Sequence, residues 1–272
     1  MVCFRNKVKT LFFMVFASVF VFGLNLASAE SLQVSIKEVK TQPEKKARLK
    51  VAEERRKNAI DEKLLGVPIP EGEGGFTSIG EIILSNDAGF LNAYAFIGYG
   101  SGKQFGLYMF RKDKYTKIVN QSTLMPDAVG YFTKIIYLSF DAKNGQIAFL
   151  GQSIFKQAGI YLYTGRDIVR VVDQQDFVPH TFTKFDHFGD ISLDNGLVAF
   201  IGFDADNNEG LYLYSSTGIY KVLNTNDSIN GKKVESIEMN YVSLVYNRIY
   251  FTARMSDYTT SDYVATFTFS PY

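Results

Sequence analysis

The residues best suited to chemistry stand in one short stretch, "VPHTFTKFDHFGD", at 178–190. It holds the only two histidines of the chain, His180 and His187, with Asp186 and Asp190 beside them. Imidazole next to carboxylate can bind a metal ion or move a proton, and connecting segments carry functional residues more often than strands do. The spacing matches no metal motif. We therefore take His180, Asp186 and His187 as candidate catalytic residues, with plain surface residues as the alternative.

A second polar stretch, "DADNNEG" at 204–210, resembles the start of a calcium loop. Asp204, Asp206 and Asn208 alternate as oxygen ligands of a hard cation do. The glycine, Gly210, comes one place later than an EF-hand needs, and the twelfth position is Ser215 rather than glutamate. Turns favour Asp and Asn in any case, so a polar hairpin tip is the competing interpretation. These three residues are the candidate metal ligands, calcium is the ion they would take, and no other cofactor is predicted.

An internal repeat must position both stretches. The phrase Ala-Phe-x-Gly begins at Ala95, Ala148 and Ala199, which are 53 and 51 residues apart. A Gly-x-Tyr phrase keeps the same two spacings. A serine recurs 54, 53 and 51 residues apart. The recurring positions are Gly106, Gly159, Gly210, Ser85, Ser139, Ser192 and Ser243. Repeats near 50 residues are typical of propellers and solenoids.

Each repeat predicts four short strands. Asn144-Gly145 and Asn195-Gly196 stand between apolar runs and suit tight type I′ hairpins, and Asn247 takes the glycine position in the fourth repeat. Runs such as "LVAFIG" and "LYLY" are apolar on both faces, so each sheet must be covered on both sides. The sequence therefore predicts an all-β, β-propeller-like fold of about four four-stranded repeats of 51–54 residues.

The recurring tyrosines of these strands could form a sugar-stacking stripe, but their place in doubly covered strands favours packing between blades. They are Tyr108, Tyr161 and Tyr212.

The fourth repeat has only three strands of its own, ending with "YVATFTF" at 263–269. A missing strand would leave an exposed sheet edge, which soluble proteins avoid. Residues 32–39 alternate apolar and polar side chains and are predicted to fill the place and close the ring. Four blades could form a monomeric ring, or half of an eight-blade ring in a homodimer.

Between that strand and the repeats, residues 43–66 are rich in helix formers, with Pro43 at the start and Gly66 at the end. The apolar stripe is thin, which favours a solvated helix or linker over a partner-binding helix. Residues 66–75 are predicted to be a linker. The predicted organisation is a signal peptide at 1–29, an N-terminal strand, charged helix and linker at 30–75, and the repeat domain at 76–272.

The first 29 residues have the pattern of a secretory signal peptide. Arg5, Lys7 and Lys9 precede an apolar run that ends at Ala27-Ser28-Ala29. Cleavage would remove Cys3 and leave 26 basic and 28 acidic residues, a formal charge of −2. That charge does not favour nucleic-acid binding. We expect an exported protein without a membrane span in its mature chain, in the periplasm or outside the cell.

The repeat resembles a family of bacterial exported proteins with tandem units of the form N-x-x-G-x-x-A-F-x-A/G, followed by G-I-Y/F-x-Y/W. The matching residues are Asn195 to Gly202 and Gly210 to Tyr214, and the likeness covers roughly residues 76–269. The resemblance implies a propeller-like fold and export, and it provides no catalytic residues to transfer.

Two functions follow as hypotheses. The first is a non-enzymatic binding or protein-interaction module, whose loops contact an unknown protein or glycan partner, because no catalytic motif such as G-x-S-x-G or H-E-x-x-H occurs. The second is a hydrolase or lyase acting on a glycan or other envelope polymer. It would use acidic residues and His180 or His187 in the loops between blades.

Overall fold

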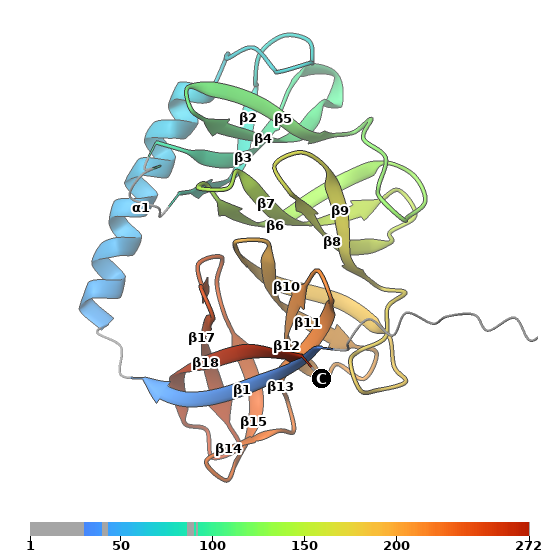
Figure 1. Cartoon of the computed structure of the whole chain (residues 1–272). Helices are drawn as coiled ribbons and strands as arrows, with labels where there is room; N and C mark the ends of the chain where they lie inside the picture. Colours follow the sequence, from blue (N-terminus) through green and yellow to red (C-terminus); the bar gives the residue numbers. More distant parts are fainter. Residues whose placement is uncertain (1–29, 40–42, 86–89, 91, 272) are drawn as a thin grey trace, which may run out of the picture.

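The computed structural model describes residues 30–39, 43–85, 90 and 92–271, and the predicted signal peptide lies outside these ranges. Four antiparallel sheets follow one another along the described chain (Figure 1). We call them blades 1 to 4. No helix of the described part is long and apolar enough to cross a membrane.

Each blade pairs its strands in order from an inner to an outer strand. Blade 1 comprises β2 (Ser78–Leu84), β3 (Tyr94–Tyr99), β4 (Phe105–Arg111) and β5 (Lys114–Asn120). Blade 2 comprises β6 (Phe132–Asp141), β7 (Gln146–Ser153), β8 (Ala158–Tyr163) and β9 (Ile168–Asp173). Blade 3 comprises β10 (Phe185–Asp194), β11 (Leu197–Asp204), β12 (Glu209–Ser215) and β13 (Gly218–Asn224).

Blade 4 is built from both ends of the described chain. Its strands run in the order β15 (Lys232–Glu238), β17 (Arg248–Met255), β18 (Thr260–Pro271) and β1 (Glu30–Val39). Two short strands, β14 (Ser228–Ile229) and β16 (Leu244–Val245), pair with β15 and β17. The inner strands of blades 1 and 2 and of blades 2 and 3 contact each other, whereas blades 3 and 4 meet through β10 with β16 and β12 with β15. The remaining elements are the helix α1 (Pro43–Leu64) and the short 3-10 helix η2 (Ser101–Lys103).

The Ala-Phe-x-Gly phrase has a packing cause. A Cβ atom on Gly202 would lie 2.7 Å from Cε1 of Phe185, the first residue of β10, and Gly98 and Gly151 are covered in the same way by Phe76 and Phe132. Real side-chain carbons do not approach so closely, so only glycine fits under the ring. In blade 4 the phenylalanine is replaced by Val234 and the glycine by Ala253, so the two sizes change together.

The recurring tyrosines belong to the same aromatic groups. Tyr212 stacks on Phe200 with ring centroids 5.4 Å apart and meets Phe185 edge-on at 5.1 Å. Blades 1 and 2 repeat this arrangement around Tyr108 and Tyr161. The predicted packing between blades is confirmed for Tyr161 and Tyr212, which lie in the cores shared by blades 1 and 2 and by blades 2 and 3. Tyr108 is buried in the cluster of blade 1 that includes Leu64 and Ile69.

The segment 66–75, predicted to be a linker, forms together with Phe76 the first copy of a loop that precedes every blade. In each copy the last residue donates a backbone N–H to a carbonyl nine or seven residues earlier. The pairs are Phe76 to Val67, Phe132 to Thr123, Phe185 to Asp176 and Val234 to Asp227. The first three copies also carry one backbone bridge each, Pro68 with Gly75, Leu124 with Tyr131 and Phe177 with Lys184. The repeated unit therefore extends back to Gly66.

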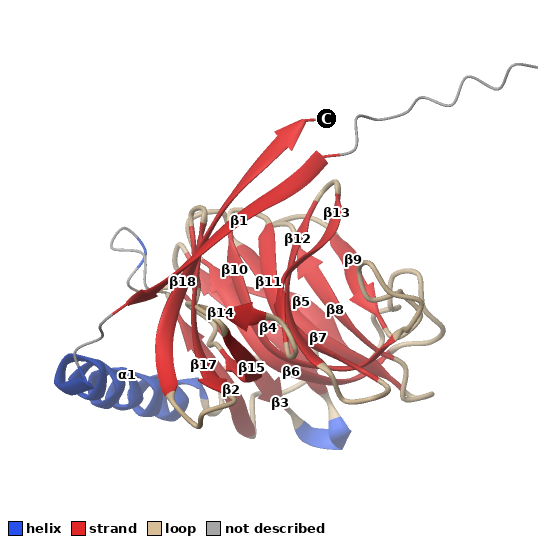
Figure 2. Ribbon diagram, turned by 90° about the horizontal axis from the view of Figure 1, so that it is seen from below, coloured by secondary structure: helices blue, strands red, loops and turns tan. Residues whose placement is uncertain are grey.

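Strand β1 occupies the predicted place as the outer strand of blade 4. It pairs with β18 over ten residues, from Glu30 opposite Pro271 to Val39 opposite Asp262. Leu32, Val34 and Ile36 pack against the core between blades 3 and 4. Figure 2 shows β1 and β18 as a long ribbon that projects beyond the other strands.

The blades form an arc whose two terminal faces do not pack on each other, so the predicted closure of the ring is wrong. The face of blade 4 that is turned away from blade 3 is polar, with Arg248 and Arg254 exposed. The outer face of blade 1 is covered by Leu64 and Ile69. Helix α1 runs along the open side between these faces (Figure 1). Alternation of polar and apolar residues in β17 and β18 suits a sheet with one solvated face, unlike the doubly apolar strands of the inner blades.

Three turn predictions meet different outcomes. Asn195 and Gly196 both have positive φ, 49° and 79°, as a type I′ turn requires. In blade 2 the loop has four residues, since Asp141 pairs with Gln146, and only Gly145 has positive φ. In blade 4 the residue with positive φ is Tyr246, at 55°, and not Asn247.

The recurring serines do not all hold the same register position in their blades. Ser139 and Ser192 stand opposite Ala148 and Ala199, but the residue opposite Ala95 is Ile83. Ser85 is out of register because the first hairpin of blade 1 is longer than those of blades 2 and 3.

Candidate binding surface

Antiparallel order gives the blades two distinct ends. The loops that precede the blades and the second hairpins lie at one end, which we call the loop end. The first and third hairpins lie at the other, which we call the hairpin end. A strand of ten residues such as β10 separates the two ends by roughly 33 Å at its usual rise.

The structure does not bring the three candidate catalytic residues into one site. His180 lies exposed at the tip of the loop before blade 3, with φ of 65°. His187 and Asp186 lie on β10, where the Nδ1 and Oδ2 atoms are 2.9 Å apart and both side chains are exposed. The His187 ring stacks on Phe203 at 4.2 Å. Within the described residues, no hydrogen bond or ion pair links His180 to this pair.

His180 occupies a position that carries an acid in the two preceding loops. Glu71 pairs with Lys117 at 2.5 Å, and Asp127 lies 3.8 Å from Arg170. Each basic residue belongs to the outer strand of the following blade, so these pairs tie a loop to its blade. In blade 3 the equivalent Lys221 pairs instead with Asp227, at 3.3 Å.

The three candidate calcium ligands form a hairpin cap. The carboxylate of Asp204 accepts the backbone N–H groups of Asp206 and Asn208 and the side-chain amide of Asn208, at 2.9–3.1 Å. Ser153 holds the equivalent position in blade 2 and accepts the N–H of Phe155. No group of three or more Asp, Glu, His or Cys side chains converges on a metal-sized site in the described chain. Asp204 thus stabilises the turn of its own hairpin. Calcium binding by these residues stays a prediction.

The loop end carries an unusual set of exposed apolar side chains. Seven large ones, each at least half exposed, lie on the loops before blades 2 and 3 and on the second hairpin of blade 2. They are Leu124, Val129, Tyr131, Ile154, Phe155, Phe177 and Phe182. We call this set the apolar tips. Single exposed apolar residues are normal, but a group on neighbouring loops marks an interaction site.

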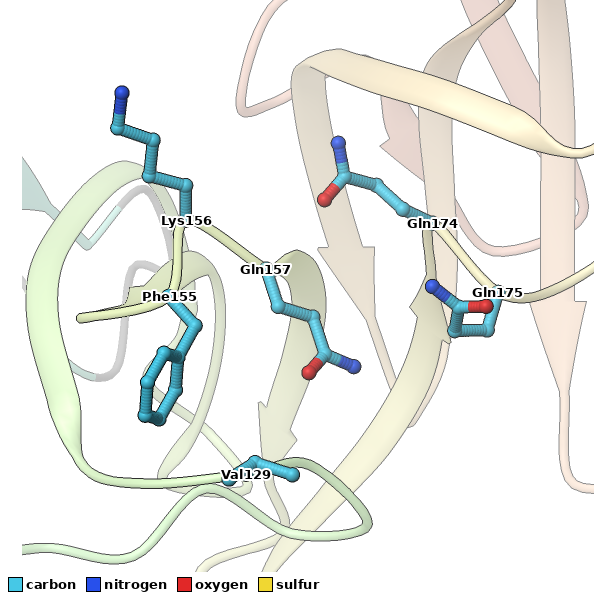
Figure 3. A pocket seen from close by; sticks show the side chains of 6 residues that line it. All are labelled: Val129, Phe155, Lys156, Gln157, Gln174 and Gln175. Atoms are coloured by element: carbon cyan, nitrogen blue, oxygen red, sulfur yellow. The ribbon is translucent and has the colours of Figure 1, made fainter.

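A hollow of about 410 Å³ lies among these tips (Figure 3). Val129 and Phe155 line one side, and Gln174 and Gln175 line the other. Gln157 stands between them, while Lys156 points away from the hollow. Ile154 and Phe155 reach within 4 Å of the space beside Gly130, so the hairpin and the loop before blade 2 meet.

The glutamine side chains are held in place. Gln157 donates to Asp173 at 3.1 Å, and Gln174 accepts the N–H of Ala158 at 2.8 Å while donating to the carbonyl of Asp186. Gln175 accepts a hydrogen bond from Lys184 at 3.0 Å. One side of the hollow is therefore lined by amide groups that hydrogen-bond to the surrounding protein.

A second pocket, of about 510 Å³, opens at the hairpin end. It includes Asp141 and Asp194, one from each of two successive blades. Asp141 accepts the N–H of Asn195 at 3.0 Å, and Asp194 accepts that of Tyr246. Burial, with Asp141 nearby, raises the pKa of the Asp194 carboxyl. The recurring serines Ser139 and Ser192 stand two residues before these aspartates.

Those serines bond one blade to the next. Ser139 accepts the N–H of Leu193 at 2.8 Å, and Ser192 accepts that of Leu244 at 2.8 Å. Ser139 also donates to the carbonyl of Tyr241 at 2.8 Å. Blade 4 keeps Ser243 but has Val245 in place of the aspartate, and in the described chain it has no following blade to bond.

Sequence reasoning missed the apolar tips, although their signal is present. Leu124 and Val129 in one loop align with Phe177 and Phe182 in the next, on either side of Pro126 and Pro179. Apolar residues at turn positions that the strand pattern does not use are the feature that would have found them.

No protein-family model and no curated protein matches the chain. Among solved structures, it is similar to the β-propeller domain of the trilobed protease from Pyrococcus furiosus, which is described as having an open velcro topology. The sequences are 11% identical, and the match covers 71% of this chain and 70% of that chain with a TM-score of 0.37. The assignment of the chain as an all-β, propeller-type protein rests on its own four sheets.

Proposed function

We propose that this protein is an exported binding or protein-interaction module that contacts its partner through the loop end. The observation that carries the proposal is the group of apolar tips around an amide-lined hollow. Apolar anchors beside fixed polar groups are the usual composition of a binding surface. The signal-peptide pattern and the resemblance to bacterial exported repeat proteins support export.

The four blades act in this proposal as a scaffold. Their cores and the bonds between successive blades hold the loops before blades 2 and 3 at a fixed separation. Rigid loops lower the entropy lost on binding.

Site-specific photo-cross-linking tests the proposal. A benzophenone amino acid would replace Phe182 in one sample and Tyr246 in another, because both side chains are exposed and they lie at opposite ends of the blades. The labelled chains would be irradiated with envelope and medium fractions of the producing cells. We expect a discrete adduct from position 182 and none from position 246. Equal adduct patterns, or none at 182, would refute the proposal.

The alternative of an envelope-polymer or glycan hydrolase or lyase needs a pair of acids free to act in a cleft. The hairpin-end pocket holds Asp141 and Asp194, but both already accept backbone N–H groups of the next blade. The candidate His180 lies apart from Asp186 and His187. No arrangement in the described residues favours this alternative, so we develop only the binding function.

A further inference from the structure

We propose that the loop end docks on an anionic lipid surface, with the apolar tips entering the boundary between headgroups and acyl chains. This inference rests on the proposed function, because it names the partner of the same surface. Three features of the loop end favour a lipid surface over a protein: the exposure of the apolar side chains, the hydrogen bonds within the loop before blade 3, and the lysines beside the tips that make no ion pair.

The first feature is the way the rings stand out. Phe182 is 100% exposed, so its ring packs against nothing in the described protein, and Phe155 and Ile154 are about 70% exposed. In the hollow, the amides of Gln174 and Gln175 lie across from Phe155. A protein interface gathers its anchors into one dry core, whereas a bilayer accepts separate rings that each reach the acyl region.

The second feature is that several backbone groups of the loop are hydrogen-bonded within the loop. In the loop before blade 3, Val178 donates to Thr183 at 2.9 Å, and Thr181 donates back to Val178 at 3.1 Å. The hydroxyl groups of Thr181 and Thr183 are 2.9 Å apart and bond each other. Unpaired N–H and C=O groups are costly in a lipid environment. The hydrogen bonds within this loop reduce the number of such groups that its tip would carry into the lipid.

The same frame keeps Phe182 from folding back. Met125 and Val178, one in each loop, are buried and anchor the loops to the body. The bridge between Phe177 and Lys184 fixes the loop as a small hairpin. The exposed rings of these loops are therefore in place before any partner binds.

The third feature is charge. Lys156 makes no ion pair in the described structure, and Lys184 contacts Gln175 and the face of Phe177 but no acid. Both lysines belong to the segments that carry the tips. A lysine near an anionic membrane contributes about 1 kcal/mol, roughly a fivefold gain in affinity. Phosphate groups above the inserted rings would meet both ammonium groups.

The absence of tryptophan from the sequence allows a direct test. Phe182→Trp would place a single indole at the loop end, and Tyr246→Trp would place one at the hairpin end as the matched control. Both positions are exposed, so neither change disturbs the core. Each purified chain, residues 30–272, would be mixed with vesicles of phosphatidylcholine alone or of equal parts phosphatidylcholine and phosphatidylglycerol.

We expect the indole at position 182 to shift its emission to the blue and to gain protection from acrylamide on the anionic vesicles. The control at 246 should do neither. Replacing both Phe155 and Phe182 by serine should weaken vesicle binding at least about tenfold, since it removes two apolar side chains from the boundary. Lys156→Glu with Lys184→Glu should weaken binding to anionic vesicles and leave the weak binding to neutral ones unchanged.

Two results would overturn the inference: an unshifted indole at 182 on both kinds of vesicle, or equal shifts at 182 and 246. A protein adduct from position 182 in the cross-linking experiment would then keep the binding function and assign it to a protein partner. Loss of both signals would remove the binding function as well. Far-UV circular dichroism of each variant checks that the blades are intact.

Discussion

Single residues decide how tightly each blade packs. The pairing of phenylalanine with glycine in blades 1 to 3, and of valine with alanine in blade 4, shows that the two positions share one volume. Interiors packed to this density respond to one carbon atom. The repeat phrase visible in the sequence is therefore a record of ring packing rather than of a ligand site.

Gly202→Ala should lower the free energy of unfolding by about 1–3 kcal/mol, because the new Cβ would collide with Phe185. Phe185→Val alone should also destabilise, through the cavity it leaves. The double variant recreates the pair found in blade 4 and should cost less than the sum of the two changes. Urea unfolding of the four proteins measures this coupling, and strict additivity would show that the two positions do not compete for space.

Individual elements were predictable where local chemistry chooses the conformation. The Asn195-Gly196 turn and the outer position of β1 follow from turn preferences and from the need to cover a sheet edge. The ordered loop in the predicted linker at 66–75 could not be recognised from composition, because Pro and Gly mark both free linkers and ordered loops. The spacing from Ile69 to Phe76 indicates an ordered, repeated loop, because the later loops share it as Met125 to Phe132 and Val178 to Phe185.

The candidate site was less predictable than the fold. Histidine and aspartate attract attention by their chemistry, yet here Asp204 caps a hairpin and His187 stacks on Phe203. The apolar tips have ordinary residue types, and only their exposure makes them significant. Exposure depends on which loops the blades bring together, which no local pattern contains.

Strand β1 should behave as a separable element. A chain that begins at residue 43 leaves the edge of β18 unpaired and uncovers the apolar residues that β1 protects. We expect it to unfold at lower urea concentration and to self-associate, and a peptide of residues 30–39 added in excess should reverse both effects. Light scattering and urea titration measure the outcome. A truncated chain as stable and monomeric as the parent would show that β1 contributes no binding energy.

At the scale of the whole molecule, three neighbouring carboxyls have raised pKa values: Glu81 on β2, Asp190 on β10 and Glu209 on β12. Partial desolvation is the main cause that raises these pKa values, although Glu81 is exposed and the other two are half-buried, and neighbouring Glu238 raises the pKa of Asp190 and Glu209 further. Lys57 of α1 acts in the opposite direction on Glu81, as do backbone N–H groups on all three. The electrostatic coupling among Glu81, Asp190, Glu209 and Glu238 shows that these four acids lie near one another.

These carboxyls predict a pH dependence with a definite sign. Because each holds its proton more firmly when folded, the folded chain binds more protons than the unfolded one between the raised pKa values and the ordinary ones near 4. The free energy of unfolding should therefore rise as the pH falls through the raised values. Urea midpoints measured from neutral to mildly acidic pH test this.

Glu209→Gln is the matched control, since an amide oxygen can still accept the N–H of Ile237. It should raise stability at neutral pH and flatten the dependence. Asp257, whose pKa Lys232 lowers to about 2, works against the trend only under more acidic conditions. A parent protein whose midpoint falls steadily from neutral to mildly acidic pH would contradict the assignment.

The pairing of β1 with β18 also implies an order for the folding steps. Glu30 meets Pro271, so the first described strand to be synthesised waits for the last one before it finds its place. Blades 1 to 3 pair neighbours in the sequence and can form as the chain lengthens, whereas blade 4 requires the closure of the longest loop in the molecule. During that interval the apolar residues of β1 remain uncovered, and a chain crossing a membrane unfolded would emerge with them first. Under the proposed export, β1 would need either rapid pairing with β18 or a chaperone on the far side of the membrane. The pairing of β1 with β18 should be the slowest folding step.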